Sequence, residues 1–74
     1  MERQFQLNWT ALVEEALRRR KALGLTQQRL AALANISTPT VSRFENHKED
    51  IQLSSILAIL KVLGMLETTS SKEG

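Results

Sequence analysis

Cysteine is absent from this 74-residue sequence, which also has only one proline, three glycines and three aromatic residues. The absence of cysteine excludes disulfides and thiolate metal sites, and it fits a reducing compartment. No apolar run approaches the roughly 18 residues of a membrane span, and no basic-then-apolar leader opens the chain. We therefore expect a soluble, cytoplasmic protein with a single small core, stabilised by helix packing or by oligomerisation.

Strand signals are missing as well, because the sequence has neither an alternating apolar run nor an Asn-Gly or Asp-Gly hairpin. Helical spacing predicts four helices, at Trp9 to about Leu23, Gln27–Ala34, about residues 38–46, and Leu53 to Leu63. The predicted fold is all-α, a compact bundle of four to five helices. We expect one domain over residues 1–66 and a polar, flexible C-terminal tail over residues 67–74.

The ends of the predicted helices carry recognisable signals. Asn8 can cap the first helix while Leu7 packs on Leu12, and Gly24 suits the left-handed residue that ends it. Thr26 can cap the second helix, and Asn35 is the non-glycine residue that best tolerates the left-handed turn after it. Ser37 or Thr38 caps the third helix, and Thr38 is favoured because proline, here Pro39, prefers the first helical position.

The modest net charge of +2 hides an uneven distribution. Residues 18–48 contain one acid, Glu45, and seven basic residues: Arg18, Arg19, Arg20, Lys21, Arg29, Arg43 and Lys48. The segments on either side are both acidic. This basic centre suggests a polyanionic partner, and the alternative is a solvated basic face.

The second and third predicted helices have the layout of a helix-turn-helix, in which the second helix of the pair enters the DNA major groove. The third helix begins with short hydroxyl side chains that can meet base edges and thymine methyl groups. Val41 and Phe44, three residues apart, would hold its opposite face on the core.

The segment LGLTQQRLAALANISTPTVSRFEN, residues 23–46, resembles the lambda/434 Cro and repressor type of helix-turn-helix, the XRE-like family. The likeness continues more weakly through IQLSSILAILKVLG and covers roughly three quarters of the chain. Two departures stand out, because the family usually has glycine at the position of Asn35 and often at that of His47. Asparagine is an acceptable substitute, whereas a histidine with a positive backbone angle would be strained, so we expect the loop at His47 to differ.

The resemblance implies a role for each matching residue. Base contacts fall to Thr38, Pro39, Ser42 and Arg43, and phosphate contacts to Gln27, Thr40, Asn46 and Lys48. Arg43 is the best specificity candidate because a guanidinium can grip guanine through two hydrogen bonds, whereas Pro39 offers only apolar contact. The basic run before the motif adds Arg18 and Arg19 as candidates for phosphate contacts.

Arg20 falls on the buried stripe of the first helix, counting by four from Ala16. The family resemblance implies a buried arginine–glutamate pair between the first helix and the end of the third, and Arg20 and Glu45 stand at those two positions. We expect the two residues to form this structural ion pair.

The fourth predicted helix is apolar on nearly every side, since only Lys61 and Gly64 interrupt residues 56–66. A domain this small cannot bury such a helix alone. We therefore predict a homodimer interface formed by Ile59, Val62, Leu63, Met65 and Leu66. A two-fold dimer would present two recognition helices about 34–36 Å apart.

These expectations combine into a homodimeric, sequence-specific DNA-binding repressor that has no catalytic activity, metal or cofactor. His47 is the only histidine and has no partners for a metal site or a catalytic triad. The short tail after LKVLGML is similar to that of HipB-type antitoxins, which pair with a kinase toxin and repress their own operon. The competing interpretation is a small phage-type or stand-alone regulator. The alternative from another class is a helical interaction module whose fourth helix binds a protein without DNA.

Overall fold

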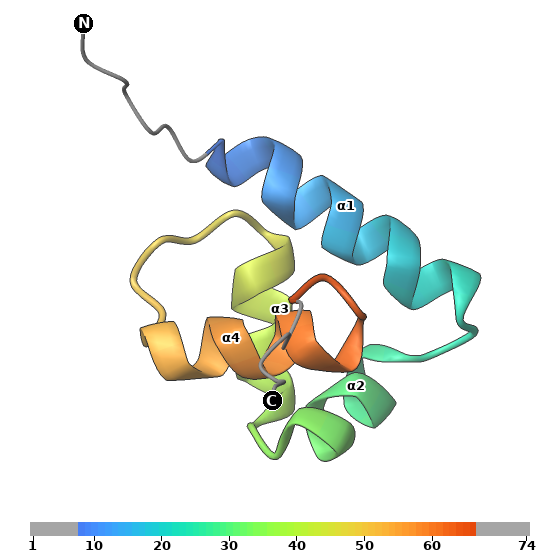
Figure 1. The fold of residues 1–74 in the computed structure, drawn as a ribbon. Coiled ribbons are helices and arrows are strands. Elements are labelled where there is room, and N and C mark those ends of the chain that lie inside the picture. The colour runs from blue at the N-terminus through green and yellow to red at the C-terminus, as the bar shows by residue number, and fades with distance from the viewer. Residues whose placement is uncertain (1–7, 67–74) are drawn as a thin grey trace, which may run out of the picture.

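The computed structural model describes residues 8–66, which form four helices: α1 (Trp9–Ala22), α2 (Gln27–Ala34), α3 (Thr38–Glu45) and α4 (Leu53–Val62) (Figure 1). This part of the chain contains no strand. Helix α1 lies along one side of the group that α2, α3 and α4 form, as Figure 1 shows. The predicted all-α architecture is confirmed, and each helix lies within a residue or two of its predicted bounds.

Local capping explains where α1 and α2 begin and end. The Asn8 side chain accepts a hydrogen bond from the Ala11 N–H at 3.0 Å, and that of Thr26 accepts one from the Arg29 N–H at 3.0 Å. After α2 the chain reverses at Asn35, whose φ of 61° places it in the left-handed region. The Asn35 N–H bonds to the last turn of α2, so this asparagine takes the place of the usual glycine. The predicted packing of Leu7 on Leu12 lies outside the described residues.

The N-terminus of α3 corrects one sequence-based expectation. Ser37, and not Thr38, is the cap: its φ of −80° and ψ of 153° are extended, and its Oγ accepts a hydrogen bond from the Thr40 N–H at 3.2 Å. Thr38 is the first helical residue and Pro39 the second. Proline is tolerated there because the first four N–H groups of a helix have no partner within it.

The loop after α3 corrects another expectation. His47 has φ 66°, so a histidine does occupy the left-handed position where the family usually has glycine. Hydrogen bonds hold this turn: the His47 N–H donates to the Phe44 carbonyl at 3.0 Å, and the Lys48 N–H donates to the Arg43 carbonyl at 3.1 Å. The indole Nε1 of Trp9 donates to the His47 carbonyl at 3.2 Å. These contacts hold the residue in a backbone conformation that costs about 1–3 kcal/mol.

Five large side chains are fully buried at the centre of the bundle: Val13, Leu30, Val41, Phe44 and Ile59. Two of them, Val41 and Phe44, come from α3, so this helix is anchored to the core through the residues that the sequence indicated. The ring of Phe44 meets the indole of Trp9 edge-on at a centroid distance of 5.6 Å. Trp9 therefore belongs to the wall of the core and fixes α3 to the start of α1.

The packing of α4 corrects part of the predicted dimer interface. Ile59 has no exposed surface and Leu63 is only 4% exposed, so both belong to the core of one chain. Helix α4 turns a stripe at helical spacing, residues 56, 59, 60 and 63, towards the rest of the core, and this stripe is covered without a partner. Val62, Met65 and Leu66 are half-buried and remain partly accessible.

Candidate nucleic-acid interface

The outward face of α3 carries the side chains that were expected to contact bases. Pro39 and Arg43 are exposed, and Thr38 and Ser42 are half-buried, while Val41 and Phe44 between them are fully buried. The helix is thus fixed to the core on one side, and its opposite side is thin and polar. This is the geometry that insertion into a groove requires.

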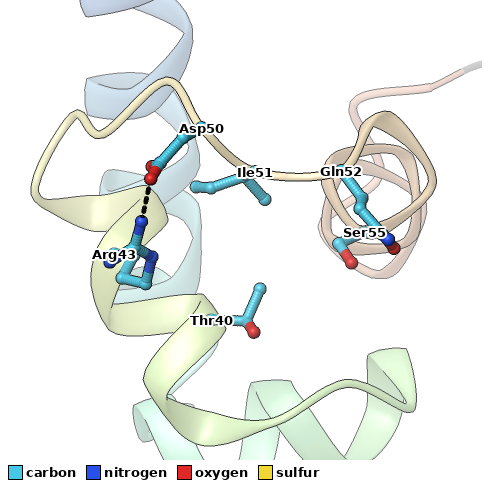
Figure 2. A pocket seen from close by; sticks show the side chains of 6 residues that line it. All are labelled: Thr40, Arg43, Asp50, Ile51, Gln52 and Ser55. Carbon is cyan, nitrogen blue, oxygen red and sulfur yellow. Dashed lines mark hydrogen bonds and ion pairs between the residues drawn. The ribbon is translucent and has the colours of Figure 1, made fainter.

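Arg43 does not point freely into solvent. Its Nη2 donates a hydrogen bond to Oδ2 of Asp50, which lies in the loop between α3 and α4 (Figure 2). The two side chains line a shallow pocket together with Thr40, Ile51, Gln52 and Ser55. Figure 2 shows Gln52 and Ser55 across this pocket from α3. Gln52 directly precedes α4, and Ser55 lies in the first turn of that helix. One wall of this pocket therefore comes from the N-terminus of α4.

Asp50, Gln52 and Ser55 were not expected at the site. Asp50 is seven residues after Arg43, a separation without helical meaning because a loop intervenes. The one available signal was the polar character of the segment from His47 to Gln52, which indicated a loop and not a contact. The polar atoms of Thr40 and Asn46 are partly engaged within α3: the Thr40 hydroxyl lies 2.7 Å from that of Ser37, and Asn46 Nδ2 donates to the Ser42 carbonyl at 2.9 Å.

A second arginine–carboxylate pair lies on the core side of the motif. Arg20 donates from Nε to Oε2 of Glu45 at 2.6 Å and from Nη2 to Oε1 at 3.1 Å. Its Nη1 also donates to the Leu25 carbonyl at 2.7 Å. The side chains are only 12% and 8% exposed. The pair therefore joins α1 to the end of α3 and to the turn before α2.

Gln27 stands at the first position of α2, and its side chain contacts the same ion pair. Nε2 of Gln27 donates to Oε1 of Glu45 at 2.8 Å. This contact leaves the second N–H of the side-chain amide, and the backbone N–H groups at the start of α2, for a ligand. The structure thus gives Gln27 a structural contact in addition to the phosphate contact expected from the sequence.

Arg18 and Arg19, two of the consecutive basic residues on α1, donate hydrogen bonds to different sets of partners. Arg18 is exposed and donates from Nε and Nη2 to the carboxylate of Glu15 at 3.0 and 2.7 Å. Arg19 donates from Nε to the same carboxylate at 2.7 Å, and its Nη1 donates to the carbonyls of Leu63 and Gly64 at 3.2 and 2.9 Å. The hydrogen bonds from Arg18 and Arg19 lower the pKa of Glu15 to about 2.

Arg19 therefore binds the carbonyls of Leu63 and Gly64, which directly follow α4. Carbonyls at the C-terminal end of a helix have no partner within the helix. A helix of 10 residues is about 15 Å long, so this contact lies about that distance from Gln52 and Ser55 at the other end of α4. Nε and Nη1 of Arg19 are engaged by Glu15 and by the carbonyls that follow α4, and phosphate contact by this residue stays a prediction. For Arg18, phosphate contact stays a prediction.

Within residues 8–66 no cluster of histidine and acidic side chains could hold a metal ion. Over the same range, none of the helices has the length and apolar character that crossing a membrane requires.

Comparison with known proteins agrees with this arrangement. The sequence model of the family described as helix-turn-helix matches residues 17–69. An uncharacterized HTH-type transcriptional regulator of Haemophilus influenzae is 33% identical over 54 residues, which are 73% of this chain and 55% of that protein. The chain therefore spans about half the length of this curated relative.

Two solved structures superimpose on the chain with a TM-score of 0.74 and 28% sequence identity. One is a chain in the structure of a HipA-HipB-O2-O3 complex, and the other is described as MDT protein. In each case the match covers 96% of this chain and 100% of the other. With the family model covering well over half of the sequence, the chain belongs to the helix-turn-helix family.

Proposed function

We propose that the protein is a sequence-specific DNA-binding repressor that reads the major groove with α3. The observation that carries this proposal is the two-sided character of α3. Val41 and Phe44 are fully buried behind it, while Pro39 and Arg43 are exposed in front. A helix fixed in this way can press its front face between two phosphate backbones without losing its own packing.

Sequence would be read by the front face of α3. The methyl group of Thr38 and the ring of Pro39 offer apolar contact to thymine methyls, and the hydroxyl of Ser42 can donate or accept. The Arg43 guanidinium has five N–H donors, of which the hydrogen bond to Asp50 uses one. The remaining donors can bind O6 and N7 of a guanine, a contact that discriminates by about 1–3 kcal/mol.

Affinity would come from phosphate contacts around this face. Candidates are the free N–H groups of Gln27 and its helix start, the exposed side chains of Asn46 and Lys48, Thr40 at the edge of the α3–α4 pocket, and Arg18 on α1. Each neutralised phosphate releases counterions, so affinity would fall steeply as the salt concentration rises.

A homodimer would suit a repressor because it presents two recognition helices to a two-fold operator. With Ile59 and Leu63 inside the core, the predicted interface reduces to Val62, Met65 and Leu66, which stay partly accessible at the C-terminal end of α4. The likeness to a chain of a HipA-HipB-O2-O3 complex supports a further step. In this reading the protein is the antitoxin of a HipA-like kinase toxin and represses its own operon.

Binding of a fluorescent duplex taken from upstream of the protein's own gene tests the proposal. We expect binding in 50 mM salt and a loss of affinity of several orders of magnitude by 200 mM. Arg43→Ala would lower the preference for the operator over scrambled DNA by about 5- to 150-fold. Lys48→Ala is the matched control: it would weaken binding to all duplexes alike and reduce the salt slope by about one.

The interaction module is the second candidate, and an exposed apolar surface on the side of α2 and α4 favours it. Leu33 is 49% exposed, and together with Ala34, Ala58 and Val62 it borders a groove that also contains Lys61. Absence of any DNA binding at low salt, with a folded protein, would support the module and overturn the repressor.

A further inference from the structure

Asp50 is an acidic side chain at a surface that is proposed to meet a polyanion. It is 71% exposed, and its carboxylate accepts a hydrogen bond from Nη2 of Arg43, which is 47% exposed. Figure 2 shows the Arg43 side chain directed at Asp50 and away from Thr40. A carboxylate here repels nearby phosphates and weakens DNA binding in general, so its position requires another explanation.

The stability of the fold does not supply that explanation. Ion pairs between exposed side chains contribute little, because water and salt screen the attraction and two long side chains lose their freedom. The Arg43–Asp50 pair has one hydrogen bond and no further partner among the described residues. The fold would survive without it.

The position of Asp50 is itself well defined. Its neighbour Ile51 is half-buried and packs against the core, which fixes the backbone of the loop next to α4. The carboxylate therefore reaches Arg43 from a loop that is anchored at the next residue, and it engages one edge of the guanidinium only. The other edge stays available, so the contact sets the direction in which the remaining donors point.

From this juxtaposition we infer that Asp50 is a positioning and specificity-determining residue that acts through Arg43. This inference rests on the proposed function and adds a residue to it. By holding one edge of the guanidinium, Asp50 restricts Arg43 to a single base position and keeps it from reaching a phosphate instead. The carboxylate also lowers affinity for DNA in which no guanine meets Arg43. Both effects raise the ratio of specific to non-specific binding.

The test measures this ratio for variants with purified full-length protein. The probes are duplexes based on the DNA upstream of the protein's own gene, in which each base pair is replaced in turn. For Asp50→Ala we expect the discrimination at the base pair read by Arg43 to fall about five- to tenfold. Affinity for scrambled DNA should rise, because a negative charge is removed.

Glu49→Ala is the matched control, because Glu49 is an exposed acid in the same loop with no ion pair among the described residues. It should raise affinity for all duplexes and leave the discrimination unchanged. Asp50→Asn keeps an acceptor oxygen and should retain part of the discrimination. In an Arg43→Ala background, Asp50→Ala should have no further effect on base preference, since Asp50 acts through Arg43.

Three outcomes would overturn the inference: unchanged discrimination in Asp50→Ala, an equal loss in Glu49→Ala, or a loss that persists without Arg43. None of them affects the proposed function, which requires only that the parent protein binds and discriminates. Failure of the parent to bind any duplex would instead overturn the proposed function, and this inference with it.

Discussion

Helix α3 takes part in two arginine–carboxylate pairs that have the same chemical groups but differ in exposure, in hydrogen bonding and in their place in the fold. Arg20 and Glu45 are 12% and 8% exposed, and their contact has two hydrogen bonds between the groups. Arg43 and Asp50 are 47% and 71% exposed and share one. The first pair lies between α1 and the end of α3, and the second lies on the outward face of the motif.

The difference shows how surroundings decide what an ion pair does. Around Arg20 and Glu45 the charges have lost most of their water, and the Leu25 carbonyl and the Gln27 amide complete the hydrogen bonding. Removing one member leaves a charge without water or partner. Around Arg43 and Asp50 water can replace either member, so the pair can serve recognition with little consequence for stability.

Breaking the buried pair should have the largest effect. We expect Glu45→Ala or Arg20→Ala to lower the free energy of unfolding by about 3–5 kcal/mol, because each leaves a buried charge unpaired. Urea denaturation followed by circular dichroism measures this loss, which is a large share of the stability of a small domain.

The double variant Arg20→Met, Glu45→Leu separates the charge effect from lost packing. Apolar side chains of similar size remove both charges together, so this variant should be more stable than either alanine variant. A Glu45→Ala protein within about 1 kcal/mol of the parent would show that solvent reaches the site, and the contrast between the two pairs would be lost.

Gln27 is an uncharged hydrogen-bond partner of the buried Arg20–Glu45 pair, so its removal tests the surroundings of the pair while both charges remain. Its Nε2 donates to Glu45 Oε1 at 2.8 Å, and a hydrogen bond to a charged group contributes about 1.5–3 kcal/mol. Since Gln27 is half-buried, we expect Gln27→Ala to cost about 1.5 kcal/mol in the same denaturation experiment. Gln28→Ala, at the exposed neighbouring position, should change stability by less than about 0.5 kcal/mol.

Breaking the exposed Arg43–Asp50 pair should change the stability of the fold far less than breaking the buried pair. Arg43→Ala and Asp50→Ala should each change the free energy of unfolding by less than about 0.5 kcal/mol, and the coupling between them in a double-mutant cycle should be within about 1 kcal/mol of zero. A coupling energy as large as that of Arg20 and Glu45 would mean that the loop after α3 depends on the Arg43–Asp50 contact. In that case Asp50 would have a structural role as well.

The two pairs also differ in how far the sequence predicts them: the Arg20–Glu45 pair was predictable, and the Arg43–Asp50 pair was not. Arg20 was placed on the buried stripe by counting four from Ala16, and the family resemblance supplied Glu45 as its partner. The helix ends at Asn8, Thr26 and Asn35 were predictable because capping depends on a few neighbouring residues. Local rules and a known motif thus placed these helix ends and the buried pair, whereas the N-cap of α3 was wrong by one residue.

The errors came from positions where packing or the course of a loop decides. The sequence shows that α4 is apolar on most sides but not which side meets the core, so it predicts Ile59 and Leu63 in a dimer interface, whereas both lie in the interior. Asp50 reaches Arg43 only because the chain turns left-handed at His47 and is fixed at Ile51. The contact between Asp50 and Arg43 has no sequence period that could have indicated it.

The smallest effect is expected at Glu15, which forms ion pairs with Arg18 and Arg19 on the surface of α1. The hydrogen bonds from Arg18 and Arg19 lower the pKa of Glu15 to about 2, from an ordinary value of 4.5. A carboxylate whose pKa is lower in the folded state adds stability that is present above about pH 4.5 and is lost as the pH falls through about 2. Because the site is open to water, salt should weaken the contribution.

Glu15→Gln tests these ion pairs by thermal denaturation at several pH values between 6 and 2. The variant should be slightly less stable than the parent at pH 6 and equal to it near pH 2, and the difference should shrink in high salt. Glu14→Gln is the matched control for the loss of one negative charge on α1, because Glu14 is an exposed neighbour with no ion pair among the described residues. If parent and Glu15→Gln respond identically to acid, the bonds from Arg19 to the Leu63 and Gly64 carbonyls hold the end of α4 without help from Glu15.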